Sequence, residues 1–449
     1  MKALKNSRKF ARRLCPVLFA AFLFAGCPVS PTTEDNSSPK TETKENSENN
    51  TGTTTVAQDN PNPENNEESK TADETEPIQK EEAPALSIGL ADKNAGANTK
   101  YVMDYLANTV YGKAVLTGIM DCAWSNDIDM DAKVLADTGS HTALMGFDFL
   151  ELTKSDSKTW RNPNQVEKAK AWWKSGGLVT FCWHWRDPST ETSANSEFDT
   201  EKTSFRIPWD SSAKALNQSS EAFSQIKADL DTVAGYLADL QDDGVVVIWR
   251  PLHEARGNYG TDWGDGSTGD AWFWWGASGP EPYIALYKYM FEYFTTTKGL
   301  HNLIWLWNGQ GADWYPGDDY VDIVGYDIYE DISADGDNHG ARESVYQDLM
   351  SWCGSKKMAA ISEGGYIPAT DALKTAAESS SAKWLYYMIW NDDDVLSDDT
   401  SDDNDNFWGG TKYNSSADKT TNAFNTDWQI NRGNAELNAL FEKMGVPLN

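Results

Sequence analysis

The chain has 449 residues and a formal net charge of −31 at pH 7. A surface this acidic repels polyanions, which argues against nucleic acids and acidic polysaccharides as partners and favours a neutral ligand. All of its 20 tryptophans lie after residue 121. We therefore expect one large aromatic-rich domain, preceded by an N-terminal part of different composition.

The first 26 residues have the composition of a secretory signal peptide. They carry six cationic side chains and no acidic one, and end in the thirteen-residue apolar stretch LCPVLFAAFLFAG, too short to span a membrane as a helix. The tripeptide Phe24-Ala25-Gly26 before Cys27 resembles a bacterial lipobox. We therefore expect a lipoprotein anchored through Cys27 at the cell surface or in the periplasm. An ordinary cleaved signal, giving a secreted protein, is the alternative.

Residues 27–85 are expected to form a disordered linker after the lipidated cysteine. No aromatic residue occurs from Pro28 to Ala85, and Thr, Glu, Asn, Ser, Pro and Lys dominate. Such a segment cannot bury enough apolar surface to offset its ordering entropy. The folded domain is then predicted to comprise residues 86–449, and its cysteines, which lack metal-site spacing, are expected to be small buried hydrophobes.

Eight apolar runs recur along this domain with segments of helical periodicity between them. The runs are 114–121, 142–150, 177–185, 244–254, 302–308, 321–329, 357–365 and 384–391, and the clearest helical segments are 162–176, 221–244 and 281–299. Eight strands alternating with helices predict a (β/α)8 TIM barrel. A doubly wound open sheet is the competing fold, but no glycine-rich phosphate turn follows the first run.

Two glutamates lie at the ends of predicted strands. Glu254 ends VVVIWRPLHE and Glu363 follows in ISEGG, and function in such barrels gathers at the carboxyl ends of the strands. Glycoside hydrolysis requires two carboxyl groups on one face of the barrel. One protonates the leaving oxygen and the other attacks the anomeric carbon.

The alternation of side chains along a strand predicts which residues face the barrel interior. In VDIVGYDIY, Asp327 and Tyr329 share a side with Gly325, whereas Tyr326 faces outward. By the same parity His184 faces inward, and its neighbours Trp183 and Trp185 face the helices. The tryptophans of AWFWWG (271–276) lie in a long loop, where we expect them to stack on pyranose rings rather than to be buried.

Taken together, WRPLHE, WFWWG, NLIWLWN, YPGDDYVDIVGYDIY and ISEGG resemble glycoside hydrolase family 26, best known for β-mannanases. The resemblance implies a retaining enzyme with Glu254 as acid/base and Glu363 as nucleophile. It also implies a set of substrate-binding residues, namely His184, His253, Trp272, Asp327, Tyr329 and Trp390.

The chain departs from the family pattern after the His-Glu pair. The segment ARGNYGTDWGDGSTGDA intervenes before WFWWG, so Trp263 is an alternative to Trp272 as the stacking platform. LTGIMD lacks the glutamine expected in the first strand, and Trp209 is a looser candidate for a sugar contact.

The leading hypothesis is a monomeric endo-β-1,4-mannanase acting on mannan, glucomannan or galactomannan, and touching a membrane only through its lipid anchor. The same chemistry on mixed-linkage β-glucan or xylan is the second hypothesis, and a non-catalytic surface glycan-binding lipoprotein is the third. No cofactor or metal is expected, because HEARG lacks the second histidine of a metal-binding helix. The aspartate-rich run 391–406 matches no EF-hand spacing and is read as a solvated loop, with calcium as the alternative.

Overall fold

The computed structural model describes residues 89–448, except 126, 151, 154–163, 191–196, 263–266, 330–336, 393–405, 411 and 425. The predictions for residues 1–26, Cys27 and the linker 27–85, and the boundary before residue 86, therefore lie outside the described residues. Trp263 and residues 393–405 of the aspartate-rich run lie outside them as well. Within the described part no helix is long and apolar enough to span a membrane.

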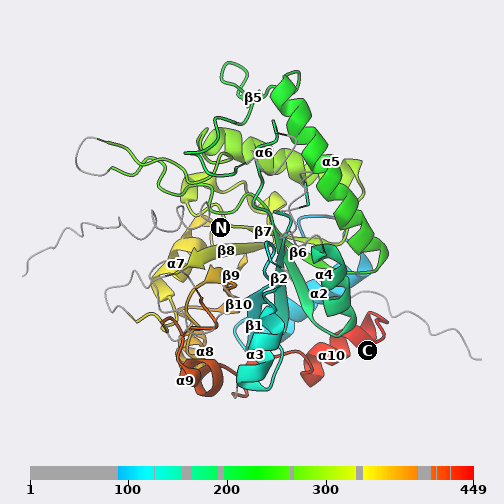
Figure 1. The fold of residues 1–449 in the computed structure, drawn as a ribbon, viewed down its shortest axis with the longest axis vertical. Coiled ribbons are helices and arrows are strands. Elements are labelled where there is room, and N and C mark those ends of the chain that lie inside the picture. Colours follow the sequence, from blue (N-terminus) through cyan, green and yellow to red (C-terminus); the bar gives the residue numbers. More distant parts are fainter. Residues whose placement is uncertain are drawn as a thin grey trace, which may run out of the picture. The chain divides into compact units, whose positions relative to one another are not determined.

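Eight parallel strands close into a barrel, which confirms the predicted fold (Figure 1). The strands are β1 (Val115–Met120), β2 (Leu144–Asp148), β3 (Leu178–Cys182), β6 (Val247–Arg250), β7 (Leu303–Trp307), β8 (Ile323–Ile328), β9 (Met358–Gly364) and β10 (Trp384–Ile389). Each lies within one of the eight predicted apolar runs. The barrel closes where β1 pairs with β10 in the register Leu116↔Tyr386.

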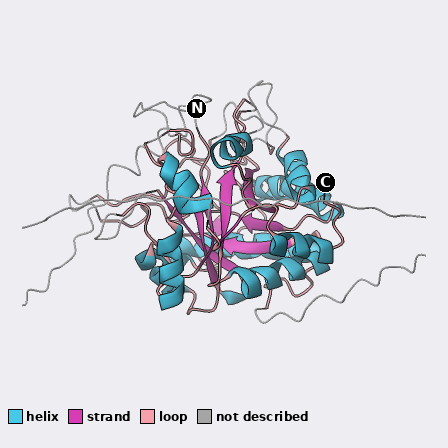
Figure 2. Ribbon diagram, turned by 90° about the horizontal axis from the view of Figure 1, so that it is seen from below, coloured by secondary structure: helices cyan, strands magenta, loops and turns pink. Residues whose placement is uncertain are grey.

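Helices surround the strands, as Figure 2 shows. They are α2 (Ala97–Tyr105), α3 (Met130–Thr138), α4 (Gln165–Lys174), α5 (Glu221–Asp242), α6 (Pro280–Glu292), α7 (Glu343–Trp352), α8 (Thr370–Ser379), α9 (Ser416–Lys419) and α10 (Ala435–Lys443). The three helical segments predicted from periodicity correspond to α4, α5 and α6, the last extended by a π-helical turn at Tyr293–Thr297. The Ser220 hydroxyl caps α5 by accepting the Phe223 N–H at 3.1 Å, and proline occupies the first turn of α6.

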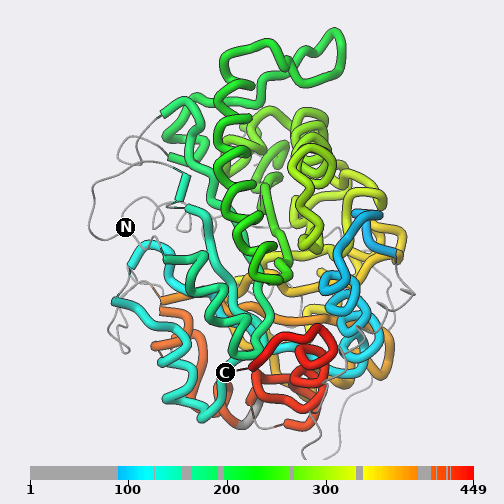
Figure 3. Tube along the Cα trace, turned by 90° about the vertical axis from the view of Figure 1, so that its right-hand side faces the viewer, coloured from blue at the N-terminus to red at the C-terminus, as the bar shows by residue number. Residues whose placement is uncertain are grey.

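Three further short strands lie outside the barrel proper. β4 (Trp209–Asp210) and β5 (Ala215–Leu216) form a small antiparallel hairpin in the connection after β3. β11 (Gln429–Ile430) adds to β1 near the end of the chain. The C-terminal α10 then packs beside the N-terminal α2, the red and blue helices of Figure 3.

The barrel interior is crowded, as the glycine in β8 indicated. A Cβ at Gly325 would lie 2.6 Å from the Ser362 hydroxyl oxygen and 2.8 Å from a Leu306 methyl carbon. Tyr326 faces the other way, with its ring centroid 6.3 Å from that of Trp352 in α7. The parity assigned to β8 is therefore the one that the structure has.

Candidate active site

Three carboxylates converge at the carboxyl ends of the barrel strands. Glu254 follows β6, Asp327 lies near the end of β8 and Glu363 near the end of β9. One carboxylate oxygen of each lies within 4.8 Å of those of the other two, and all three side chains are buried. The sequence reasoning predicted that Glu254 and Glu363 open on the same face, and the structure brings them together.

The backbone around Glu254 explains why an apolar strand ends in RPLHE. Leu252 and Glu254 both have φ of 51°, in the left-handed region that non-glycine residues seldom adopt. The Glu254 N–H donates to the Asn308 carbonyl at 2.7 Å, which ties this turn to the end of β7. Strained backbone of this kind concentrates at functional sites, where surrounding contacts hold a side chain in one orientation.

Both oxygens of Glu363 are hydrogen-bonded. The Arg250 guanidinium donates to Oε2 at 2.8 Å, and the Tyr329 hydroxyl donates to Oε1. The same guanidinium donates to Asp327 at 2.8 Å, and Ser362 donates to the other Asp327 oxygen, also at 2.8 Å. The planar guanidinium presents its N–H donors in a fixed fork, so Arg250 sets the mutual orientation of Asp327 and Glu363.

Burial raises the pKa of Asp327 to about 7; the charge of Arg250 opposes that rise, and the charge of Glu363 adds to it. One guanidinium thus faces two buried carboxyl groups whose like charges repel each other. The Arg250 guanidinium offsets part of this repulsion, because it donates to both carboxyl groups.

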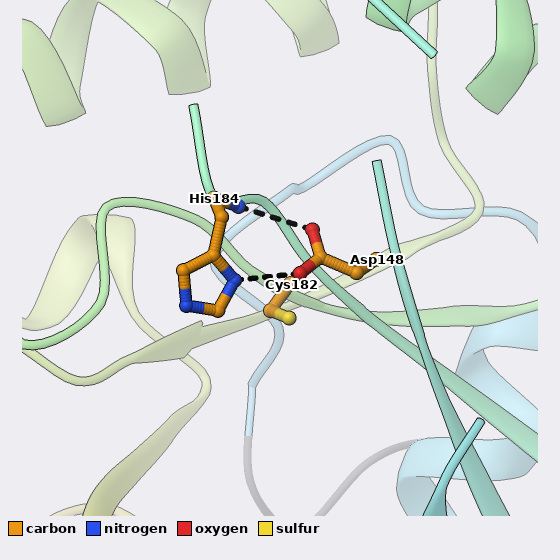
Figure 4. A group of neighbouring side chains, drawn as sticks. All are labelled: Asp148, Cys182 and His184. Carbon is orange, nitrogen blue, oxygen red and sulfur yellow. Dashed lines mark hydrogen bonds and ion pairs between the residues drawn. The ribbon is translucent and has the colours of Figure 1, made fainter. Parts of the chain in front are cut away.

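A second buried cluster lies beside the first. Asp148, Cys182 and His184 each offer one atom within 4.8 Å of the others', and Figure 4 shows the carboxylate of Asp148 facing the His184 ring. The Asp148 carboxylate lies 2.6 Å from His184 Nδ1 and accepts the His184 backbone N–H at 3.0 Å. His184 Nε2 in turn lies 3.2 Å from His253 Nε2. The two predicted substrate-binding histidines are therefore direct neighbours.

One of the two remaining predicted aromatic contacts lies beside these histidines. Trp390, immediately after β10, is fully buried with its ring centroid 5.7 Å from that of His184. Trp272 is half-buried and packs against the core. Gly257 lies tightly against Trp272: its φ is +48°, and a Cβ there would stand 2.7 Å from the Trp272 nitrogen. Only glycine fits that position.

The expectation that the AWFWWG tryptophans are exposed platforms is wrong for two of them. Trp274 and Trp275 are fully buried. The Trp274 indole donates to the Trp185 carbonyl at 2.7 Å and the Trp275 indole donates to the His253 carbonyl at 2.9 Å. The loop folds back over the end of β3, so these tryptophans are core residues that fix the turn carrying His253.

Trp183 and Trp185 behave as their parity predicted. Their rings stack with centroids 4.0 Å apart, both side chains are buried, and the Trp185 indole donates to Asp229 in α5 at 2.8 Å.

Sequence reasoning missed Arg250 and Asp148. Each was visible as a charged residue at the end of an otherwise apolar strand run. Arg250 also shares the parity of Ile248 and pairs with the inward-facing Cys182 across β3 and β6, which would have placed its guanidinium inside the barrel.

Both clusters have the donor types that a cation would need, oxygen atoms in one and nitrogen, oxygen and sulfur in the other. In the first, however, two of the three carboxylates already accept hydrogen bonds from the Arg250 guanidinium. In the second, the 2.6 Å between Asp148 and His184 is a hydrogen-bond length.

A (β/α)8 barrel with two glutamates converging at the carboxyl ends of its strands defines a glycoside hydrolase. A family model described as glycosyl hydrolase family 26 matches residues 91–404. The chain belongs to this family.

Curated relatives include two fungal proteins. Mannan endo-1,4-beta-mannosidase of Thermothelomyces thermophilus is 33% identical over 313 residues, which cover 68% of this chain and 58% of the relative. Mannan endo-1,4-beta-mannosidase B of Piromyces sp is 32% identical over 320 residues, covering 70% and 50%. The chain thus matches only about half the length of these relatives.

Two solved structures are also similar to this chain. A Podospora anserina GH26-CBM35 β-(1,4)-mannanase superposes with a TM-score of 0.62 at 30% identity, covering 79% of this chain and 72% of that one. A β-mannanase from a symbiotic protist of the termite Reticulitermes speratus, complexed with gluco-manno-oligosaccharide, gives 0.61 at 28% identity and covers 78% and 98%.

Proposed function

We propose that the chain is a retaining endo-β-1,4-mannanase that hydrolyses mannan-type polysaccharides by double displacement. Glu363 is the nucleophile and Glu254 the acid/base. The observation that carries the proposal is the approach of the Glu254 and Glu363 carboxylate oxygens within 4.8 Å. Retaining glycosidases hold these groups ~5–5.5 Å apart, whereas inverting enzymes need ~6.5–9.5 Å to admit a water molecule.

The hydrogen bonds around Glu363 suit a nucleophile. Arg250 and Tyr329 donate to its two oxygens, which aligns the carboxylate for attack. Glu254, whose carboxylate approaches that of Glu363, is then the group that exchanges a proton with the leaving oxygen and afterwards with water.

The substrate is proposed from the relatives, several of which are named mannan endo-1,4-beta-mannosidases. Hydrolysis of mannan, glucomannan and galactomannan, measured beside mixed-linkage β-glucan and xylan, tests it. Mannans should be cleaved fastest. Faster cleavage of glucan or xylan would assign the same chemistry to a different sugar, and no cleavage of any of them would leave a glycan-binding protein.

Glu254→Ala tests the acid/base assignment. Turnover of mannan should fall by about 10²–10⁴, the usual contribution of general acid catalysis. With an aryl mannoside whose leaving group needs no protonation, the rate of the first step should fall far less, and azide should restore turnover by attacking the glycosyl-enzyme.

Proton NMR of the first-formed product should show retained configuration; inverted product would overturn the proposal.

We also propose that the protein is a monomer held at the cell surface or in the periplasm by lipid on Cys27. The support is the sequence Phe24-Ala25-Gly26-Cys27 behind a cationic, apolar N-terminus. Cys27→Ala should move the protein from the membrane fraction to the soluble fraction with its activity unchanged. Cys353→Ala, which alters a buried cysteine of the domain, is the matched control and should stay with the membrane.

A further inference from the structure

The carboxylate of Asp148 makes three hydrogen bonds at the end of β2. Oδ1 accepts the backbone N–H groups of Leu150 at 2.9 Å and of His184 at 3.0 Å. Oδ2 lies 2.6 Å from His184 Nδ1 (Figure 4). The backbone bonds fix the position of the carboxylate, and the third bond is its only contact with a titratable proton among the described hydrogen bonds.

The two backbone N–H groups that donate to Oδ1 of Asp148 favour its ionised form. An ionised carboxylate only accepts hydrogen bonds, so His184 Nδ1 must carry a proton. Nδ1 of His253 is buried and has no hydrogen-bond partner among the described residues, and a buried N–H is rarely left unpaired, so the His253 proton lies on Nε2 and Nε2 of His184 is the acceptor of a neutral ring. The 3.2 Å contact with His253 Nε2 therefore requires His253 to donate.

The other ring nitrogen of His253, Nδ1, carries no proton. Burial lowers the pKa of His253 well below its usual value, and the charge of Arg250 lowers it further, so this ring is neutral. With its proton on Nε2, Nδ1 carries a lone pair. No hydrogen bond reaches Nδ1 from the described residues, and a missing partner is tolerated more readily at an acceptor than at a buried N–H.

We propose that Asp148 is a positioning residue that sets the tautomers of both histidines, Nδ1–H on His184 and Nε2–H on His253, and so orders the hydrogen bonds beside Glu254. The chain of bonds runs from the carboxylate of Asp148 through His184 to the residue that immediately precedes Glu254. Its effect on catalysis rests on the function proposed above, whereas the tautomers do not.

A metal ion is the competing explanation for Asp148, Cys182 and His184. Tetrahedral zinc with ligands at ~2.0 Å keeps its ligand atoms about 3.3 Å apart. Asp148 Oδ2 and His184 Nδ1 are 2.6 Å apart, so a proton rather than a metal ion joins them.

Asp148→Asn reverses the polarity of this chain with almost no change in shape. The amide oxygen can still accept the two backbone N–H bonds, and the amide NH₂ then faces His184 Nδ1. A donor at that place requires an unprotonated Nδ1, which moves the His184 proton to Nε2 and the His253 proton to Nδ1. Both tautomers should therefore switch together.

Nitrogen-15 NMR of the imidazole rings in the substrate-free protein measures the tautomers directly. The chain has five histidines, and His→Gln variants at His141, His301 and His339 remove the signals that do not belong to the pair. Wild type should show Nδ1–H at His184 and Nε2–H at His253, and Asp148→Asn the reverse. Protonation of both His184 nitrogens in wild type, or unchanged tautomers in the variant, would overturn the proposal.

Kinetics on mannan supply the second measurement. Carboxylates that orient metal-ligating histidines contribute about 10–100-fold, and a carboxylate that orients His184 in the same way should contribute similarly, so kcat of Asp148→Asn should fall about tenfold or more. Asp322→Asn is the matched control, since Asp322 is a buried aspartate at the opposite end of the barrel that accepts two backbone N–H groups at 2.6 and 2.8 Å. It should lose stability and keep its kcat; an equal loss of kcat in both variants would reduce Asp148 to a structural role.

The two proposals fail separately. If wild type cleaves no glycan but shows the expected tautomers, the function is wrong and the role of Asp148 as the tautomer-setting group stands. If wild type cleaves mannan and the tautomers differ, the function stands and this inference is wrong. Should Asp148→Asn fail to fold, the wild-type spectrum alone decides between these outcomes.

Discussion

Arg250 bonds two buried carboxylates at once, and only 3% of its own side chain is exposed. Removing one partner from a buried ion pair leaves uncompensated charge, whose cost exceeds the attraction that the pair contributed. Arg250 thus serves stability as well as the orientation of Glu363.

Arg250→Met should lower the free energy of unfolding by about 3–5 kcal/mol at neutral pH. Burial already raises the pKa of Asp327 to about 7, and loss of the cation raises it further. A carboxyl whose folded pKa exceeds its unfolded pKa favours the fold at low pH and loses that benefit as pH rises through the folded value. The deficit should therefore be larger at pH 7.5 than at pH 4.5.

Urea unfolding of both proteins at these two pH values checks this prediction. Lys174→Met, which removes a half-exposed cation paired with Asp243 at 3.4 Å, is the control and should change stability by less than about 0.5 kcal/mol. A deficit for Arg250→Met that is the same at both pH values would show that the Asp327 carboxyl group is not the source.

The roles of individual side chains were harder to predict from the sequence than the positions of the strands that carry them. Glu254 and Glu363 follow from strand ends, and Asp327 and Tyr329 from strand parity. Asp148 could not be assigned from sequence, because its role depends on a histidine 36 residues away in the chain. The left-handed backbone at Leu252 and Glu254 is likewise set by the tertiary bond to Asn308 rather than by local preference.

At the scale of elements the eight strands were predictable because each is a short, mainly apolar run that is almost entirely buried. β4, β5 and β11 were not, since strands of two residues leave no periodicity. The burial of two tryptophans in the loop 271–276 was not predicted, because aromatic residues from other loops and strand ends can pack over a loop of a large barrel. Trp274 lies between Trp185 and Phe205, with ring centroids 5.0 Å from each.

Two tryptophans in neighbouring elements should respond differently to truncation. Trp183→Ala removes a buried ring stacked on Trp185, so the free energy of unfolding should fall by roughly 3–5 kcal/mol while the folded enzyme keeps its kinetics. Trp272→Ala alters a half-buried ring in the loop after β6, and turnover of mannan should fall about tenfold or more if this ring is the platform beside the cleaved bond.

Thermal unfolding and steady-state kinetics of both variants, with Trp263→Ala as the third, check this pair. Full activity in Trp272→Ala together with loss of activity in Trp263→Ala would transfer the stacking role to Trp263.

At the scale of the whole molecule, the barrel depends on a pairing between its first and last strands. β1 pairs with β10 over four residues, from Leu116↔Tyr386 to Ile119↔Ile389, and β11 adds to β1 later in the chain. A chain that ends before Trp384 lacks both partners and exposes the edges of β1 and β9. We expect it to lack a cooperative thermal transition in circular dichroism, which the chain ending at Asn449 should show. A cooperative transition in both chains would contradict this.

That pairing also has a consequence for synthesis. A ribosome releases the chain from its N-terminus, so β1 emerges some 270 residues before the strand that completes its hydrogen bonds. During that interval parallel strands with open edges are exposed, the condition under which partly folded chains associate with one another. Closure must also overcome the loop entropy of nearly the whole domain, which slows folding. The yield of folded enzyme should therefore depend more on temperature and chaperone supply during translation than the stability of the finished barrel would suggest.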